Sequence, residues 1–175
     1  MEIREAQIAD APAIARVHVD SWRSTYRGIV PDDYLAQLSY SQREQYWRRW
    51  INAGHEKQFL YVAQDEGNIV GFALGGPERS RNSIYDGELY VIYVLEAHQR
   101  KGIGRLLVSQ VARSLLQQGI ESMLVWVLAD NPSRRFYERL GGEPVAEQNI
   151  SIGGAELKEV AYGWRDIYVL AGMDT

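Results

Sequence analysis

The stretch that decides the fold reads ELYVIYVL at residues 88–95 and, after three residues, QRKGIG at 99–104. Residues 88–95 are rich in β-branched and aromatic side chains and nearly free of charge, which is typical of a strand covered on both faces. A helix is expected from about 104 to 118, because the apolar side chains that follow lie on one helical stripe. These are Ile103, Leu107, Val111 and Leu115.

The turn at 99–104, between this strand and this helix, has the features of an anion site. The first N–H groups of a helix have no intrahelical partner, so they can hold a phosphate. Gly102 and Gly104 let the backbone approach the anion without an intervening side chain. Basic side chains add positive charge around the turn. They are Arg100, Lys101 and Arg105.

Two better-known phosphate motifs do not fit this turn. A dinucleotide-binding motif would need a third glycine where Leu107 stands, and no opening βαβ unit precedes it. A P-loop would need Gly-Lys-Ser/Thr, which does not follow. Because Gly-x-Gly is common between a strand and a helix, the pattern alone leaves an ordinary turn open.

Outward from this centre, the periodicity predicts six further strands and three further helical stretches. Strands are expected at 2–7, 59–64, 69–74, 123–128, 144–152 and 155–164, and helices at 10–28, 31–54 and 131–141. A polar loop is expected from Gly75 through Asn82. This order predicts an α/β (α+β) fold, a mixed and largely antiparallel sheet of about seven strands flanked by about four helices, with one central parallel βαβ unit. No linker divides the chain, so residues 1–175 are expected to form a single domain.

The composition excludes several classes of protein. The 175 residues carry a net charge of −4, which argues against nucleic-acid binding. No apolar run approaches the roughly 20 residues of a membrane span, and the amino terminus lacks the apolar centre of a secretory signal. A cytoplasmic protein is therefore expected. Without cysteine, and with three histidines at no ligand spacing, no metal site is expected.

The chain resembles the GCN5-related N-acetyltransferase (GNAT) family. The family signature Gln/Arg-x-x-Gly-x-Gly/Ala after the fourth strand is matched by Gln99, Gly102 and Gly104. Residues 131–141 are similar to the family's Asn-x-x-(Ala)-x-x-Phe-Tyr-x-x-Leu-Gly helix, although Arg134 or Arg135 stands where alanine is frequent. The expected element order also agrees, so the resemblance extends over nearly the whole chain.

The resemblance implies that acetyl-CoA is the co-substrate and lies between the fourth and fifth strands. The pantetheine arm would pair with the fourth strand as an added strand, and the N–H of Val94 would polarise the thioester carbonyl. The turn would cradle the pyrophosphate, and Asn131 would touch the arm. The implied cofactor-binding residues are Ile92, Tyr93, Val94, Gln99, Arg100, Lys101, Gly102, Ile103, Gly104, Arg105 and Asn131.

Two catalytic roles follow from the same resemblance. Tyr137 would protonate the leaving thiolate, although a tyrosine beside Phe136 is also typical of a core aromatic. Glu88 would act as general base, because roughly one alkyl amine in a thousand is uncharged at neutral pH. The alternative for Glu88 is a solvated carboxylate at a strand end. Since no cysteine is available, direct transfer is favoured over a covalent acyl-enzyme.

The acceptor is less well defined than the donor. Aromatic residues gather in the first two helical stretches, and Trp22 and Tyr26 are the preferred candidates for the acceptor wall, whereas Trp47 and Trp50 have core spacing. His18 is expected at the core boundary and His98 in an exposed loop. The expected acceptor is an amine of a small molecule or peptide. A longer acyl-CoA, an O-acceptor, and a non-catalytic acyl-CoA sensor remain alternatives, and a homodimer through the carboxy-terminal strands is possible, as in many relatives.

Overall fold

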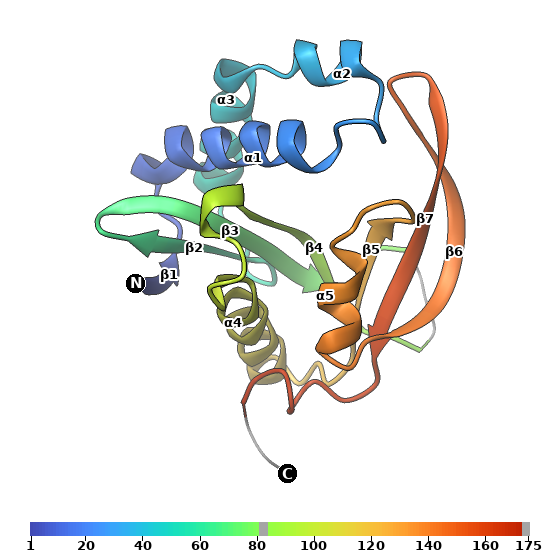
Figure 1. Cartoon of the computed structure of the whole chain (residues 1–175). Coiled ribbons are helices and arrows are strands. Elements are labelled where there is room, and N and C mark those ends of the chain that lie inside the picture. Colours follow the sequence, from blue (N-terminus) through green and yellow to red (C-terminus); the bar gives the residue numbers. More distant parts are fainter. Residues whose placement is uncertain (81–83, 173–175) are drawn as a thin grey trace.

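The computed structural model of the protein describes residues 1–80 and 84–172, and a twisted sheet runs through its centre (Figure 1). Seven strands form the sheet in the order β1-β2-β3-β4-β5-β7-β6. Their bounds are β1 Glu2–Glu5, β2 Phe59–Asp65, β3 Asn68–Pro77, β4 Gly87–Val94, β5 Met123–Leu128, β6 Glu143–Ile152 and β7 Ala155–Trp164. All neighbours are antiparallel except β4 and β5, which run parallel. The expected mixed, largely antiparallel sheet is confirmed.

Helices cover both faces of this sheet (Figure 1). Their bounds are α1 Ala11–Thr25, α2 Asp32–Gln37, α3 Tyr40–Ala53, α4 Ile103–Gln117 and α5 Arg134–Arg139, with short 3-10 turns η1 Ile8–Asp10 and η2 Glu96–His98. The first three helices lie on one face, and α4 and α5 lie on the other. The sheet thus separates the layer of α1, α2 and α3 from the layer of α4 and α5, which follows the turn at 99–104.

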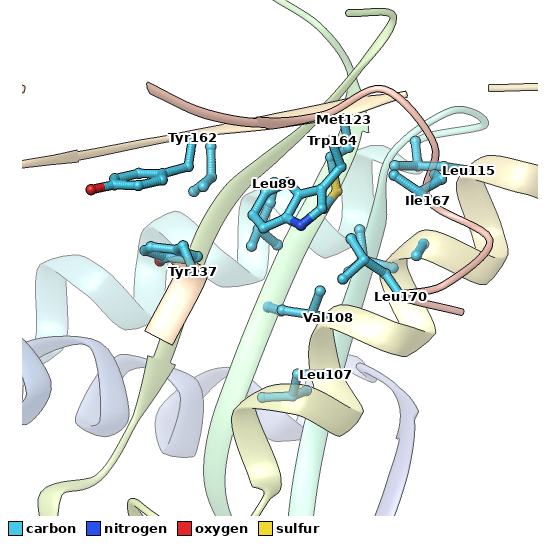
Figure 2. Packing of buried hydrophobic residues seen from close by; sticks show 14 of the residues in the cluster. Leu89, Leu107, Val108, Leu115, Met123, Tyr137, Tyr162, Trp164, Ile167 and Leu170 are labelled. Atoms are coloured by element: carbon cyan, nitrogen blue, oxygen red, sulfur yellow. The ribbon is translucent and has the colours of Figure 1, made fainter. Parts of the chain in front are cut away.

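The sheet divides the buried side chains into two clusters. On the α4 side, Leu107 and Val108 pack in one cluster with Leu89 and Met123, as Figure 2 shows. The expected apolar stripe of α4 is buried throughout in this cluster. On the other side, Trp47 of α3 packs among α1 and strand residues. Removal of this apolar surface from water is the main stabilising contribution to such a core.

Two boundaries differ from the sequence-based expectation. The second helical stretch is two helices, because Leu38 is extended and the Ser39 hydroxyl caps α3 by accepting from the N–H of Gln42 at 3.2 Å. β3 continues to Pro77 through Gly75 and Gly76, where a loop was expected; the rest of that expected loop reaches residues 81–83, outside the described part. A Cβ on Gly75 would lie 2.4 Å from Cγ1 of Val111. Close packing against α4 therefore explains this glycine better than a turn does.

The central parallel pair is short, and this creates a gap in the sheet. Gly87 pairs with Met123 and Glu88 with Leu124, and the two fully described strands pair nowhere else. Between Leu89 and Val91, β4 carries one extra residue relative to β3. Such a bulge bends its strand and increases the local twist. From residue 89 onward, the edge of β4 that faces β5 therefore carries backbone groups without a strand partner.

Candidate active site

The gap between β4 and β5 is the place where the expected cofactor residues meet. Ile92 and Val94 pack toward the α4 side of the sheet, while Tyr93 packs toward α1. On its other edge, residues 71–73 of β3 pair with residues 92–94 of β4. The free edge can accept an extended ligand as an additional strand. This geometry agrees with the expectation for Ile92, Tyr93 and Val94, whose contact with a cofactor stays a prediction.

The turn at 99–104 joins the end of β4 to the start of α4 and places bare amides beside the gap. Gly102, the residue before the helix, has φ of +82°, and Arg100 has φ of +61°. Left-handed residues of this kind turn successive N–H groups into a concave, anion-binding surface. A Cβ on Gly102 would meet nothing within 4 Å, so open space lies over this residue. The turn therefore has both the amides and the room that a pyrophosphate needs.

The second glycine of the motif has a different role. A Cβ on Gly104 would lie 3.1 Å from Cζ of Phe136, so the ring of α5 covers this residue. The buried side chain of Ile103 fixes the first turn of α4 in the core. Gly104 therefore allows α5 to approach α4, and contact of the Ile103 and Gly104 backbone with a cofactor stays a prediction.

The polar side chains of the turn divide into a structural and a charged group. Gln99 donates from Nε2 to the carbonyl of Val94 at 3.0 Å, which ties the turn to the end of β4. Arg100, Lys101 and Arg105 are exposed, and none has an acidic partner among the described residues. Their positive charge is therefore available to an anion at the turn.

Tyr137 lies on α5 within the buried cluster of Figure 2, where its ring stacks on Tyr162 at 6.0 Å between centroids. It has the burial of a core aromatic, but its hydroxyl makes no hydrogen bond with any described residue. Burial raises the pKa of Tyr137 well above its ordinary value, and the nearby Tyr26 raises it further. The phenol is therefore protonated at neutral pH, which is the form that a proton donor needs.

Glu88 opens β4 on the sheet face opposite Leu89, and it is not a solvated carboxylate, because it is only 3% exposed. Arg79 donates to both of its oxygens, from Nη2 to Oε1 at 2.7 Å and from Nε to Oε2 at 3.2 Å. The backbone N–H of Arg79 adds a third bond to Oε2 at 3.0 Å. Glu88 in turn raises the pKa of Arg79. These three bonds hold the carboxyl group of Glu88 in one fixed orientation.

Arg79 is a site residue that the sequence did not reveal. Its side chain is 59% exposed and its guanidinium lies 3.9 Å from the centroid of the Tyr90 ring. Contact across the aromatic face and the two bonds to Glu88 fix the guanidinium plane. In the sequence, Arg79 is only an arginine shortly after a strand. Such residues are common on protein surfaces, so the sequence did not identify it as the partner of Glu88.

The expected acceptor residues meet the cofactor residues on the α1 side of the gap. Trp22 donates from Nε1 to the hydroxyl of Tyr93 at 2.9 Å, and its ring lies 4.6 Å from that of Tyr26. Burial raises the pKa of Tyr26, and the polar side chains of Tyr93 and Asn131 beside it lower the pKa by a smaller amount. Asn131 is itself buried and its Oδ1 accepts from the N–H of Ser133 at 2.8 Å. One polar cluster therefore joins α1, β4 and the start of α5.

The histidines differ slightly from expectation. His18 is buried rather than at the core boundary, and it stacks on Tyr93 at 5.2 Å between ring centroids. Trp47 donates from Nε1 to Nδ1 of His18 at 3.3 Å. Burial, with a smaller contribution from Arg43, lowers the pKa of His18 to about 3. The imidazole of His18 is therefore uncharged at neutral pH and packs against aromatic rings beside the site. His98 is partly buried instead of exposed.

No group of three potential metal ligands occurs among the residues that the structure describes. None of the described helices is both long and apolar enough to cross a bilayer. The described residues of the site are backbone amides, one buried carboxylate, and polar, aromatic and basic side chains.

Known proteins with a similar sequence are named N-acetyltransferases, and solved structures of acetyltransferases have a similar fold. Residues 78–150 match the family model described as FR47-like protein. An uncharacterized N-acetyltransferase of Bacillus subtilis, YuaI, is 50% identical over 96% of this chain and 95% of its own length. Phosphinothricin N-acetyltransferase of Streptomyces viridochromogenes is 31% identical over 81% and 73%. The PaiA N-acetyltransferase of Thermoplasma acidophilum, solved with coenzyme A, superposes with a TM-score of 0.72 at 20% identity, over 90% of this chain and 96% of that chain.

Proposed function

Because the chain belongs to the GCN5-related N-acetyltransferase family and is an acetyltransferase, we propose that it moves the acetyl group of acetyl-CoA directly to a primary amine of a small molecule or peptide. The observation that carries this proposal is the gap between β4 and β5, with bare helix amides at one end and Glu88 at the other. A long, anionic thioester fits such a gap, because its diphosphate and its reacting carbon need different surroundings.

The donor half of the gap suits coenzyme A. The pantetheine arm lies along the free edge of β4, where its amides replace the missing β5 partner. Val94 lies six residues from Glu88 along β4, roughly 20 Å at the usual rise of a strand, so the reacting carbon lies nearer Glu88 than Val94 does. A free-edge backbone N–H of β4 beside that carbon stabilises the oxyanion, a contribution worth about 3–4 kcal/mol in comparable sites. The open space over Gly102 and the exposed basic side chains receive the pyrophosphate. PaiA, solved with coenzyme A, has the same fold, which supports this placement.

Glu88 takes one proton from the ammonium, directly or through a water molecule, and so frees the amine. The amine nitrogen attacks the thioester carbon, the C–N bond forms and the C–S bond breaks, and the Tyr137 phenol gives its proton to the leaving thiolate. The nitrogen then loses its second proton, which returns to the phenolate directly or through water and leaves a neutral amide. The acetyl group passes between the substrates in a ternary complex, since the chain has no cysteine to carry it.

The first test measures thiol release from acetyl-CoA with a panel of primary amines, including amino acids, polyamines and peptide amino termini. We expect at least one amine to raise the rate above the background hydrolysis without acceptor. Alcohols and longer acyl-CoA esters, tested in parallel, should react more slowly. Tight binding of acetyl-CoA with no rate increase for any acceptor would favour a sensor and contradict the proposed enzyme activity.

The role of Tyr137 is tested by Tyr137→Phe, which removes only the hydroxyl. We expect turnover to fall by about a hundredfold, a typical effect of losing a general acid, with nearly unchanged acetyl-CoA affinity. The matched control is Tyr162→Phe, because the Tyr162 hydroxyl bonds to Glu138 and Arg134 on the same helix. If both variants lose activity equally, displacement of α5 explains the effect and Tyr137 has no acid role.

A further inference from the structure

A hollow of about 120 Å³ lies between the first turn of α4, the end of α5 and the carboxy-terminal segment, away from the gap where the chemistry is placed. Its walls are Arg105, Val108, Arg139, Leu140, Val169 and Leu170. No acidic side chain of the described residues lines it. Both arginines are exposed, and neither forms an ion pair within the described residues. Within residues 1–80 and 84–172, two positive charges therefore share one apolar hollow without an ion-pair partner.

The walls of the hollow are fixed rather than loosely placed. Val108 and Leu170 belong to one buried cluster, which Figure 2 shows in side view. Arg113 donates from Nε to the carbonyl of Ala171 at 2.9 Å, and the N–H of Ile167 donates to the carbonyl of Glu121 at 3.0 Å. The carboxy-terminal segment is thus anchored on both sides of the hollow. A ligand would not need to order this wall, so binding there costs less conformational entropy.

The hollow adjoins the turn that was assigned to the pyrophosphate. Arg105 follows Gly104 directly in the first turn of α4. Phe136, whose ring covers Gly104, lies one helical turn before Arg139 on α5. The contact between these two helices therefore brings Arg105 and Arg139 to one hollow that begins at the first turn of α4.

Building on the proposed function, we propose that Arg139, together with Arg105, binds the 3′-phosphate of coenzyme A in this hollow. In coenzyme A the 5′-diphosphate and the 3′-phosphate monoester sit on the same ribose, so an anion site one sugar away from the pyrophosphate is what the ligand requires. A phosphate monoester carries about −1.5 to −2 charges at pH 7, which two arginines balance. Guanidinium groups bind such oxygens in bidentate geometry, and the apolar walls reduce competition from water.

The experiment compares coenzyme A with dephospho-coenzyme A, which lacks only the 3′-phosphate, by calorimetry on the full chain. We expect the wild type to bind coenzyme A about tenfold more tightly, since the arginines are partly exposed and each charge-assisted contact is moderately weakened by solvent. Arg139→Ala should remove most of this difference by weakening coenzyme A while leaving dephospho-coenzyme A nearly unchanged. Arg105→Ala should weaken both ligands, and coenzyme A more strongly.

The control is Arg49→Ala, which removes the same charge from the exposed surface of α3, on the opposite face of the sheet. It should keep the full preference for coenzyme A. Equal affinity of the wild type for the two ligands would overturn the 3′-phosphate site and leave the proposed acetyl transfer intact. An Arg139→Ala variant that loses affinity equally for both ligands would also overturn it. Absence of binding by either ligand to folded wild type would instead contradict the proposed function itself.

Discussion

Gly102→Trp is expected to weaken acetyl-CoA binding by a hundredfold or more, which calorimetry on the folded variant measures. The indole would fill the open space over the start of α4, where the pyrophosphate is placed. Loss of two charge-assisted contacts to backbone amides, at about 1.5–3 kcal/mol each, is enough for an effect of this size. A second cost arises because φ of +82° is unfavourable for any side chain.

Gly102→Ala separates these two causes. Alanine carries the same backbone penalty, but its Cβ would meet nothing within 4 Å. We therefore expect Gly102→Ala to lose some stability and to keep most of its affinity. Gly102→Trp with wild-type affinity would place the pyrophosphate elsewhere. Equal losses in both variants would assign the effect to the backbone of the turn, and would also remove the argument for the open space.

Features that depend on neighbouring residues could be predicted from the sequence. The strand at 88–95, the turn at 99–104 and the apolar stripe of α4 depend on local sequence, and each lies close to where it was expected. The mixed, largely antiparallel character of the sheet followed from the order of elements along the chain and from the rule that a strand, helix and strand form a parallel unit. By contrast, the glycines at 75 and 76 have the composition of a turn, yet they lie in β3. Glycine is needed at these two positions because the side chains of Val111 and Tyr90, which are distant in sequence, approach the backbone closely.

The candidate site divides in the same way. The cofactor turn could be predicted from the sequence, because the free N–H groups at the start of a helix can bind an anion without help from distant residues. The Arg79–Glu88 pair could not, because its geometry depends on how β3 and β4 pair, with Gly76 facing Glu88, and on the burial of the carboxylate. The joining of Trp22, Tyr93 and Asn131 in one cluster likewise depends on three elements that meet only in the folded chain.

Glu88→Gln is expected to give the largest loss of turnover, about a hundredfold to ten-thousandfold, because the amide cannot accept the ammonium proton. The measurement is the steady-state rate with the best acceptor of the amine panel, together with acetyl-CoA affinity, which should be little changed. Burial of Glu88 allows a second explanation, namely that the variant leaves Arg79 without its carboxylate and displaces the end of β3.

Arg79→Gln distinguishes these explanations, because it breaks the same pair and keeps the carboxylate. If the pair is only structural, Arg79→Gln and Glu88→Gln should lose activity to the same extent. If Glu88 is the base, Arg79→Gln should retain much more activity than Glu88→Gln, because it keeps the group that accepts the proton. Full activity of Glu88→Gln would exclude Glu88 as the base and leave water or another group to deprotonate the amine.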